Sequence, residues 1–241
     1  MKKLITIATL PLLLATTLMS QLSCSTEADR NDNEEPASGV HVEISWVDFI
    51  RFNDIMYARK VVPLDSFAEE DLKYYDKTKR KLADNVDDLN YRSKNGDSAF
   101  LEEETPVYSI KGYSPDFRLI VKTETETRLY EADTNPHAKK GADLLDIGDK
   151  VEYIGINSPI DGKTELAPIR EESLVSSLVE LVLNAPVDQT VRSSGGSQLF
   201  IAFHLSDGTM VNRSFWSDTG ELSRGIMLPD EFGRIIEPFI P

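Results

Sequence analysis

The alternation of apolar and polar residues predicts mainly β-structure over residues 40–169. The segment "VEISW" at 42–46 alternates as a half-buried strand does. Further strands are predicted for "TPVYSIKGY" at 105–113, "FRLIVK" at 117–122 and "RLYEA" at 128–132. Over the same range, Asn-Asp, Asn-Gly and Asp-Gly pairs favour tight turns. They predict hairpins at Asn53-Asp54 and Asp161-Gly162 and a turn at Asn95-Gly96.

Three segments have features of helices. In "SFAEEDLKYY" at 66–75, Ser66 is a possible N-cap and Glu69 completes a capping box. Residues 171–183 carry adjacent stripes of leucine and valine at helical spacing, with serines and Glu180 on the other face. The closing "LPDEFGRIIEPF" at 228–239 predicts a short helix that begins near a proline.

The runs at 198–205 and 209–216 flank Asp207-Gly208 and predict a hairpin with a two-residue loop. That loop pairs Phe203 with Asn212 and Leu199 with Trp216, so Trp216 is expected on the buried face with Phe203. We expect helix 171–183 to cover this face, because each element otherwise lacks a partner for its apolar surface. The other face, which carries Phe200, His204 and Arg213, is a candidate contact surface.

These elements predict an α+β fold, predominantly antiparallel β. A β-rich N-terminal part, residues 40–169, is followed by a helix–hairpin–helix C-terminal unit at 170–241. The alternative is that the two pack as one domain.

The first residues have the pattern of a secretory signal. Lys2 and Lys3 precede an uncharged apolar run that ends at Met19. The run is shorter than the roughly 20 residues that a transmembrane helix needs, and Pro11 interrupts it. We therefore expect residues 1–23 to be a signal peptide.

Leu22, Ser23 and Cys24 resemble the lipobox of bacterial lipoproteins, with Gln21 where that class usually has an apolar residue. The resemblance implies that Cys24 becomes a lipid-carrying N-terminus. Cys24 is the only cysteine in 241 residues, and lipidation would account for this odd thiol. The expected location is the extracytoplasmic face of the cell membrane, with the lipid anchor on Cys24 as the contact with the membrane.

The segment after Cys24 contains no large apolar side chain, so residues 24–39 are predicted to be a disordered acidic tether. Loss of the signal peptide removes two lysines and changes the formal charge from −15 to −17. Such a chain repels the phosphates of nucleic acid, which excludes that class of partner. An envelope protein or peptide, a cation or a cationic wall component remains open as a partner.

The body of the chain is similar to a group of uncharacterised secreted lipoproteins of Bacillus-like bacteria. The similarity covers most of residues 80–235 and rests on "NGDSAFL", "YSIKGY", "EADTNPHAKKGADLLDIG" and "LSRGIMLP". It implies no activity and no site residues.

Sequence motifs for catalysis are few. The triplet Asp218-Thr219-Gly220 occurs once, whereas aspartic proteases need two such carboxylates, and it is also a good β-turn. The three histidines, His41, His137 and His204, form no local metal motif. Hard cations prefer oxygen ligands, and the weak metal candidates are Asp84, Asp87, Asp88 and Asp97. No cofactor is predicted.

The sequence therefore favours a non-enzymatic binding or interaction module of the cell envelope, held to the membrane by lipid. The alternatives are an envelope hydrolase with an unrecognised site and a Ca²⁺-binding structural protein.

The anchor can be tested directly. Replacing Cys24 by alanine should release the protein from the membrane, because a polar tether has nothing apolar to hold it there. Radiolabelled palmitate should mark the wild-type protein and leave the variant unlabelled. An alanine variant that still sediments with membranes, beside a wild-type protein that takes up no label, would contradict the lipoprotein hypothesis.

Overall fold

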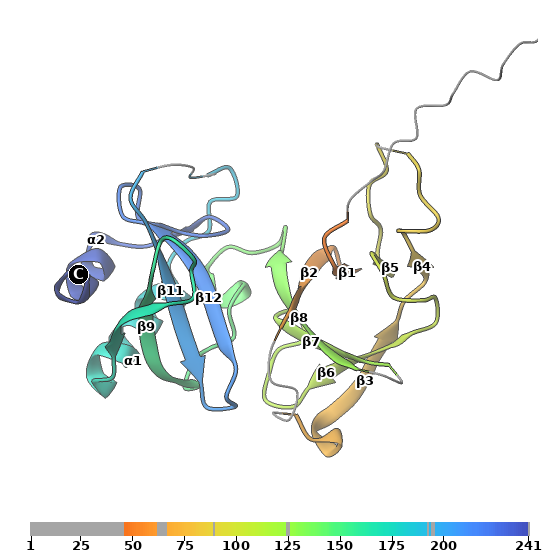
Figure 1. The fold of residues 1–241 in the computed structure, drawn as a ribbon, viewed down its shortest axis with the longest axis horizontal. Coiled ribbons are helices and arrows are strands. Elements are labelled where there is room, and N and C mark those ends of the chain that lie inside the picture. The colour runs from red at the N-terminus through yellow and green to blue at the C-terminus, as the bar shows by residue number, and fades with distance from the viewer. Residues whose placement is uncertain are drawn as a thin grey trace, which may run out of the picture. The chain divides into compact units, whose positions relative to one another are not determined.

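Most of the regular secondary structure in the described chain belongs to two β-sheets (Figure 1). The computed structural model describes residues 46–61, 67–88, 90–123, 126–191, 193 and 196–240. These residues all belong to one compact unit, Val42–Pro241. The predicted signal peptide, Cys24 and the predicted tether lie outside the described residues.

The first sheet has eight strands in the order β3-β6-β7-β8-β2-β1-β5-β4. Neighbouring strands are antiparallel except β4 and β5, which are parallel. The strands are β1 (Phe49–Phe52), β2 (Ile55–Lys60), β3 (Leu72–Lys77), β4 (Arg80–Lys81), β5 (Asp97–Ser98), β6 (Pro106–Ile110), β7 (Arg118–Lys122) and β8 (Thr127–Thr134).

The second sheet has six antiparallel strands in the order β10-β9-β11-β12-β13-β14. The strands are β9 (Val151–Asn157), β10 (Glu165–Ile169), β11 (Gln198–Leu205), β12 (Met210–Trp216), β13 (Glu221–Leu222) and β14 (Ile226–Met227).

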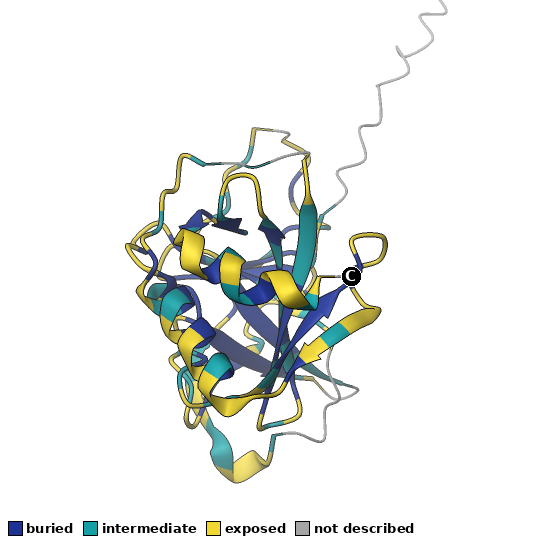
Figure 2. Ribbon diagram, turned by 90° about the vertical axis from the view of Figure 1, so that its left-hand side faces the viewer, coloured by how far each residue is buried: buried dark blue, intermediate teal, exposed yellow. Residues whose placement is uncertain are grey.

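Two short α-helices, α1 (Glu172–Asn184) and α2 (Asp230–Ile236), pack on the second sheet (Figure 1). The valine and leucine stripes of α1 share one apolar core with β9, β11 and β12, which confirms that this helix covers the hairpin. Both helices have buried and exposed sides (Figure 2). Single 3₁₀ turns lie at Glu69–Asp71, Gly141–Asp143 and Glu237–Phe239.

The predicted α+β class with a helix–hairpin–helix C-terminal unit is wrong. The described chain is mostly β, and its two α-helices are short. The physical reason is that β11 hydrogen-bonds to β12 on one side and to β9 on the other. The hairpin is therefore the centre of a six-stranded sheet that begins in the preceding segment. Local periodicity shows the elements but not this pairing over a long sequence distance.

The helix predicted at 66–75 is also wrong. The chain makes only a 3₁₀ turn at Glu69–Asp71 and then continues as strand β3. Strand β3 pairs with β6, and there the rings of Tyr74 and Tyr108 lie edge to face, with their centres 6.3 Å apart. Such cross-strand aromatic pairs stabilise a sheet and here override the local helix signal.

The predicted register of the β11–β12 hairpin is off by one residue. The loop has three residues, Ser206-Asp207-Gly208, and closes with a 2.8 Å hydrogen bond from Leu205 N to Thr209 O. Among the three only Gly208 has a positive φ, 78°, as in a turn followed by a glycine bulge. Phe203 therefore pairs with Val211, and Trp216 pairs with Gln198. Phe203 is fully buried as predicted, but Trp216 lies on the opposite face.

The other turn predictions are confirmed. Asn53 and Asp54 both have positive φ, 48° and 63°, and connect β1 to β2 in the two-residue geometry that matches strand twist. Strands β9 and β10 form the predicted hairpin around Gly162. Asn95-Gly96 forms a turn before β5.

A fully buried arginine links the two sheets. Arg118 on β7 donates to Oε1 of Glu131 on β8, with Nε at 3.0 Å and Nη2 at 2.5 Å. Its Nη1 donates to Thr209 Oγ1 at 2.8 Å and lies 3.4 Å from Asp207 Oδ2, both at the β11–β12 turn. The guanidinium carbon is also 4.9 Å from the ring centre of Tyr113. The charge of Arg118 is thus shared between a carboxylate in its own sheet and one in the other sheet.

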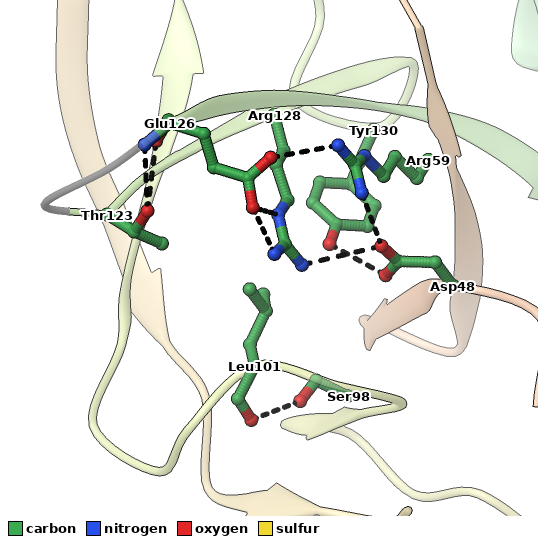
Figure 3. A network of polar contacts seen from close by, with 8 residues as sticks. All are labelled: Asp48, Arg59, Ser98, Leu101, Thr123, Glu126, Arg128 and Tyr130. Carbon is green, nitrogen blue, oxygen red and sulfur yellow. Dashed lines mark hydrogen bonds and ion pairs between the residues drawn. The ribbon is translucent and has the colours of Figure 1, made fainter.

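A second polar network lies on the first sheet (Figure 3), and its charged side chains are 17–37% exposed. Asp48 accepts a hydrogen bond from the Tyr130 hydroxyl at 2.9 Å and pairs with Arg59 and Arg128 at 3.5 and 3.4 Å. Glu126 pairs with the same two arginines. This network fixes the start of β1 against β2 and β8.

Removing Arg118 should strongly destabilise the fold. Arg118→Met leaves Glu131 as a buried charge without its partner, which costs about 3–5 kcal/mol of unfolding free energy. The matched control is Arg59→Met, whose side chain is 37% exposed; it should cost about 1 kcal/mol or less. Urea unfolding measures both. Equal effects of the two substitutions would contradict the central role of Arg118.

Candidate functional site

A pocket of about 540 Å³ lies beside strand β12, and we call it the edge pocket. It receives residues from β2 and the end of β8 in the first sheet and from β11, β12 and the β13 region in the second. Its lining consists of Lys60, Asp133, Thr134, Asn135, Leu144, Val187, Gln189, Ser193, Phe200, Asn212, Arg213, Ser214, Trp216, Glu221, Ser223 and Arg224.

The position of the pocket follows from the strand order. Strand β12 pairs with β11 along its length, but β13 pairs only with Phe215 and Trp216. In the described chain, residues 210–213 therefore have a neighbour in the sheet on one side only, and Ser214 O already accepts a hydrogen bond from Ser223 N at 2.7 Å on the other side. A free strand edge exposes side chains from both faces, so Arg213 enters the pocket from one face and Asn212 from the other.

Two aromatic rings line the pocket on one face of the hairpin. Phe200 pairs with Ser214, and Trp216 pairs with Gln198, so the two aromatic residues are diagonal neighbours. Both side chains are only partly buried. The register of the hairpin thus places two apolar rings where a ligand could contact them.

Arg213 is 8% exposed, and few groups in the described chain stabilise its positive charge. Its Nη1 donates to the neighbouring carbonyl oxygen of Asn212 at 3.1 Å. The nearest carboxylate oxygen among the described residues, Glu131 Oε2, is 3.9 Å away and accepts no hydrogen bond. Burial lowers the pKa of Arg213 from its usual value, and the charge of Glu131 opposes this effect.

Lys60 is the second cation of the pocket. Its backbone pairs with Leu129 in the first sheet, but its ammonium group makes no hydrogen bond or ion pair to any residue that the structure describes. Burial lowers the pKa of the Lys60 ammonium, and the nearby charge of Arg213 lowers it further. Both effects arise because positive charge is gathered in a space with little water.

The acids of the lining, in contrast, are engaged. Asp133 is paired with Arg224. Glu221 is 2% exposed and accepts backbone hydrogen bonds from Ser193 N at 2.8 Å and Gly225 N at 3.1 Å. These carboxylates hold the walls of the pocket together and leave Lys60 and Arg213 facing it.

Two further polar atoms in the lining are buried and have no hydrogen-bond partner among the described residues: Nε1 of Trp216 and Oδ1 of Asn212. Asn212 is fixed at its other end, because its Nδ2 donates to Gly162 O at 2.6 Å. Buried polar groups are normally hydrogen-bonded, and an exception requires an explanation. One donor and one acceptor are therefore available to a molecule in the pocket.

The β9–β10 loop supports this side of the pocket. Asp161 closes the loop by accepting hydrogen bonds from the backbone of Lys163 and from the backbone and hydroxyl of Thr164, at 2.6 to 2.9 Å. A side chain at Gly162 would contact the ring of Phe200 at 3.2 Å. The loop thus positions Asn212 and packs closely on Phe200.

The predicted metal candidates do not form a cation site in the described chain. Asp84 is paired with Lys81 at 2.6 Å. Asp88 caps the backbone of Asn90, and Asp97 accepts hydrogen bonds from the Tyr91 hydroxyl and Lys94 N. Asp87 is exposed. Among the residues described, no three His, Cys, Asp or Glu side chains lie close enough to hold a metal ion.

The histidines lie outside the edge pocket. His204 stacks on Tyr153 at 4.0 Å, and its Nε2 is 3.7 Å from Glu165. Burial lowers the pKa of His204, an effect that Glu165 opposes and Arg170 reinforces. His137 is in a shallow hollow with Ser114, Asp116 and Asp143, and its nearest described acid is Asp54 at 4.0 Å. His41 lies outside the described residues.

The triplet Asp218-Thr219-Gly220 forms the turn between β12 and β13, with Gly220 at φ 71°. Oδ2 of Asp218 accepts a hydrogen bond from Ser197 N at 3.1 Å. The carboxylate thus holds a loop, as the β-turn interpretation expects.

Sequence reasoning missed Lys60 and Arg213 as site residues. No local signal links them, because they come from different sheets and are 153 positions apart. Phe200 was expected on the candidate contact face and lies there. The one-residue error in register affected the other two: Arg213 was expected beside His204 but lies on the face of Phe203, and Trp216 was expected beside Phe203 but lies on the face of Phe200.

No family model matches the chain, and no match is found among curated proteins or among solved structures. Among the described residues, no helix is long and apolar enough to cross a membrane.

The hydrogen bonds to Asp161 predict an unusual acidity. They hold the pKa of this carboxyl at about 2, below its value of about 3.9 in an unfolded chain. The folded state therefore gains stability from Asp161 above pH 4 and loses it as the pH falls through 4 toward 2. Carboxyl NMR titration measures the pKa. Thr164→Val should raise it toward the usual value, with Asp188 as internal control; an unchanged value would contradict the role of Thr164.

Proposed function

We propose that this protein is a lipid-anchored, extracytoplasmic binding module that holds a small ligand in the edge pocket. The observation that carries the proposal is the set of unsatisfied polar groups around two aromatic rings. Lys60 and Trp216 Nε1 lack partners in the described chain, and Arg213 has only a backbone carbonyl within hydrogen-bond distance. Ligand pockets typically combine apolar walls with a few converging polar groups of this kind.

The chemistry of the lining favours binding over hydrolysis. A serine nucleophile needs a base within hydrogen-bond reach. The lining contains Ser193, Ser214 and Ser223 but no histidine, and Lys60 has no hydrogen bond to these serines. The lining acids Asp133 and Glu221 are held by structural partners. None of these groups is arranged as a nucleophile and its base.

The sequence supports the location. A lipidated Cys24 followed by a polar tether would hold the folded part near the membrane while leaving it free in water. The strongly acidic chain would not adhere to anionic lipid head groups. A ligand would therefore be met in solution outside the membrane, and the edge pocket would not need to contact lipid.

The proposal can be tested with the fluorescence of Trp216. Trp46→Phe removes the other tryptophan, so the emission then reports on the pocket alone. Titration with defined sets of amino acids, short peptides, sugars and organic acids should give a saturable change for at least one class. Ser223→Tyr in the same background fills the pocket and should abolish that change.

The matched control is Ser109→Tyr, on β6 of the first sheet and absent from the pocket lining. It should leave the response intact. If no class of compound gives a saturable response, or if the response survives Ser223→Tyr, the edge pocket is not the ligand site.

A further inference from the structure

We infer that the edge pocket recognises the carboxylate of an organic acid, whose planar apolar part lies against Phe200 and Trp216. This inference rests on the proposed function and specifies the class of ligand.

The sign of the ligand charge follows from which charged groups of the lining already have a hydrogen-bond or ion-pair partner. Asp133 and Glu221 are engaged by Arg224 and by backbone N–H groups. Lys60 has no partner among the described residues, and Arg213 lacks a carboxylate within hydrogen-bond distance. The free groups are therefore donors with positive charge, and an anion satisfies them. Hydrogen bonds between ionised groups are the stronger kind.

The amount of charge favours a monoanion. Glu131 Oε2, at 3.9 Å from Arg213 Nη1, already balances part of the charge on this arginine. The three cations Lys60, Arg213 and Arg224 are then balanced by Asp133, Glu221 and Glu131, so the pocket and its nearest carboxylate carry about equal numbers of positive and negative charges. A carboxylate adds one negative charge to this balanced set, whereas a phosphate monoester adds about two at neutral pH.

The other groups of the lining indicate what the rest of the ligand contains. Trp216 Nε1 supplies a neutral donor, and Asn212 Oδ1 can accept one hydrogen bond from a hydroxyl or amide of the ligand. Phe200 and Trp216 present ring surface on the same face of the sheet. Because Arg213 enters from the other face of β12, a flat molecule would lie across the strand edge, with its acid toward Lys60 and Arg213 and its ring against Phe200 and Trp216.

The inference is tested by fluorine NMR of the full-chain protein with a matched pair of probes. 4-Fluorobenzoate carries the carboxylate, and 4-fluorobenzamide has the same shape without the charge. The benzoate should bind about tenfold or more tightly than the amide, since a charged hydrogen bond contributes that much. 4-Fluorophenyl phosphate should bind more weakly than the benzoate.

A pair of lysine variants locates the effect. Lys60→Met should weaken benzoate binding about tenfold and leave amide binding unchanged. The control Lys111→Met, in the turn after β6 and with a side chain that is 79% exposed, should change neither. Lys60 is only partly buried and has no partner among the described residues, so this variant should fold.

Each contrary result has a distinct meaning. Equal binding of benzoate and benzamide, tighter binding of the phosphate, or no effect of Lys60→Met overturns the carboxylate inference. If benzoate does not bind while another class of compound gives a saturable Trp216 response, the inference fails and the proposed function stands. If no compound of any class binds, both fail.

Discussion

The burial of Arg118 is the constraint on which the relation between the two sheets depends. A guanidinium without access to water requires nearby anionic partners. Here one partner, Glu131, comes from the first sheet, and the other, Asp207, from the turn of the hairpin in the second. Burial alone would raise the pKa of Asp207, but hydrogen bonds from Thr209 and Tyr113 and the charge of Arg118 lower it below its usual value. Asp207 therefore stays ionised, and the contact between the sheets stays charged on both sides.

The same buried charges determine the properties of the edge pocket. Glu131 Oε1 accepts a hydrogen bond from Arg118, and its Oε2 lies 3.9 Å from Arg213 Nη1 without a hydrogen bond. The Glu131 carboxylate, which accepts its hydrogen bonds from the buried Arg118, thus also stabilises the charge of Arg213 at the pocket wall. The two sheets supply complementary parts, since Lys60 comes from the first and the aromatic rings from the second. A site of this kind exists only when both sheets are formed.

The strands and turns were largely predictable from sequence, because alternation and turn dipeptides are local. The errors arose where contacts between residues far apart in the sequence determined the secondary structure or the strand pairing. The pairing of β3 with β6 replaced a predicted helix, and the pairing of β11 with β9 joined the predicted C-terminal unit to the rest. The hairpin register failed for a different reason. In the turn, the Asp207 carboxylate accepts hydrogen bonds from the Thr209 and Tyr113 hydroxyls and pairs with Arg118. These contacts fit a three-residue loop in which only Gly208 has a positive φ. No pattern in the sequence indicated that Arg118 would be buried.

Residues 210–213 of β12, which have no strand neighbour on one side among the described residues, have a consequence for solubility. A strand edge with free backbone groups is a template for another chain, and charged side chains on the edge are one way in which proteins prevent such pairing. Arg213 donates to the carbonyl of Asn212 and so covers an acceptor with a charged group from the same strand. Neutral substitutions at this position would remove the protection together with the charge. The arginine that faces the pocket would thus also oppose the pairing of two copies of the protein edge to edge.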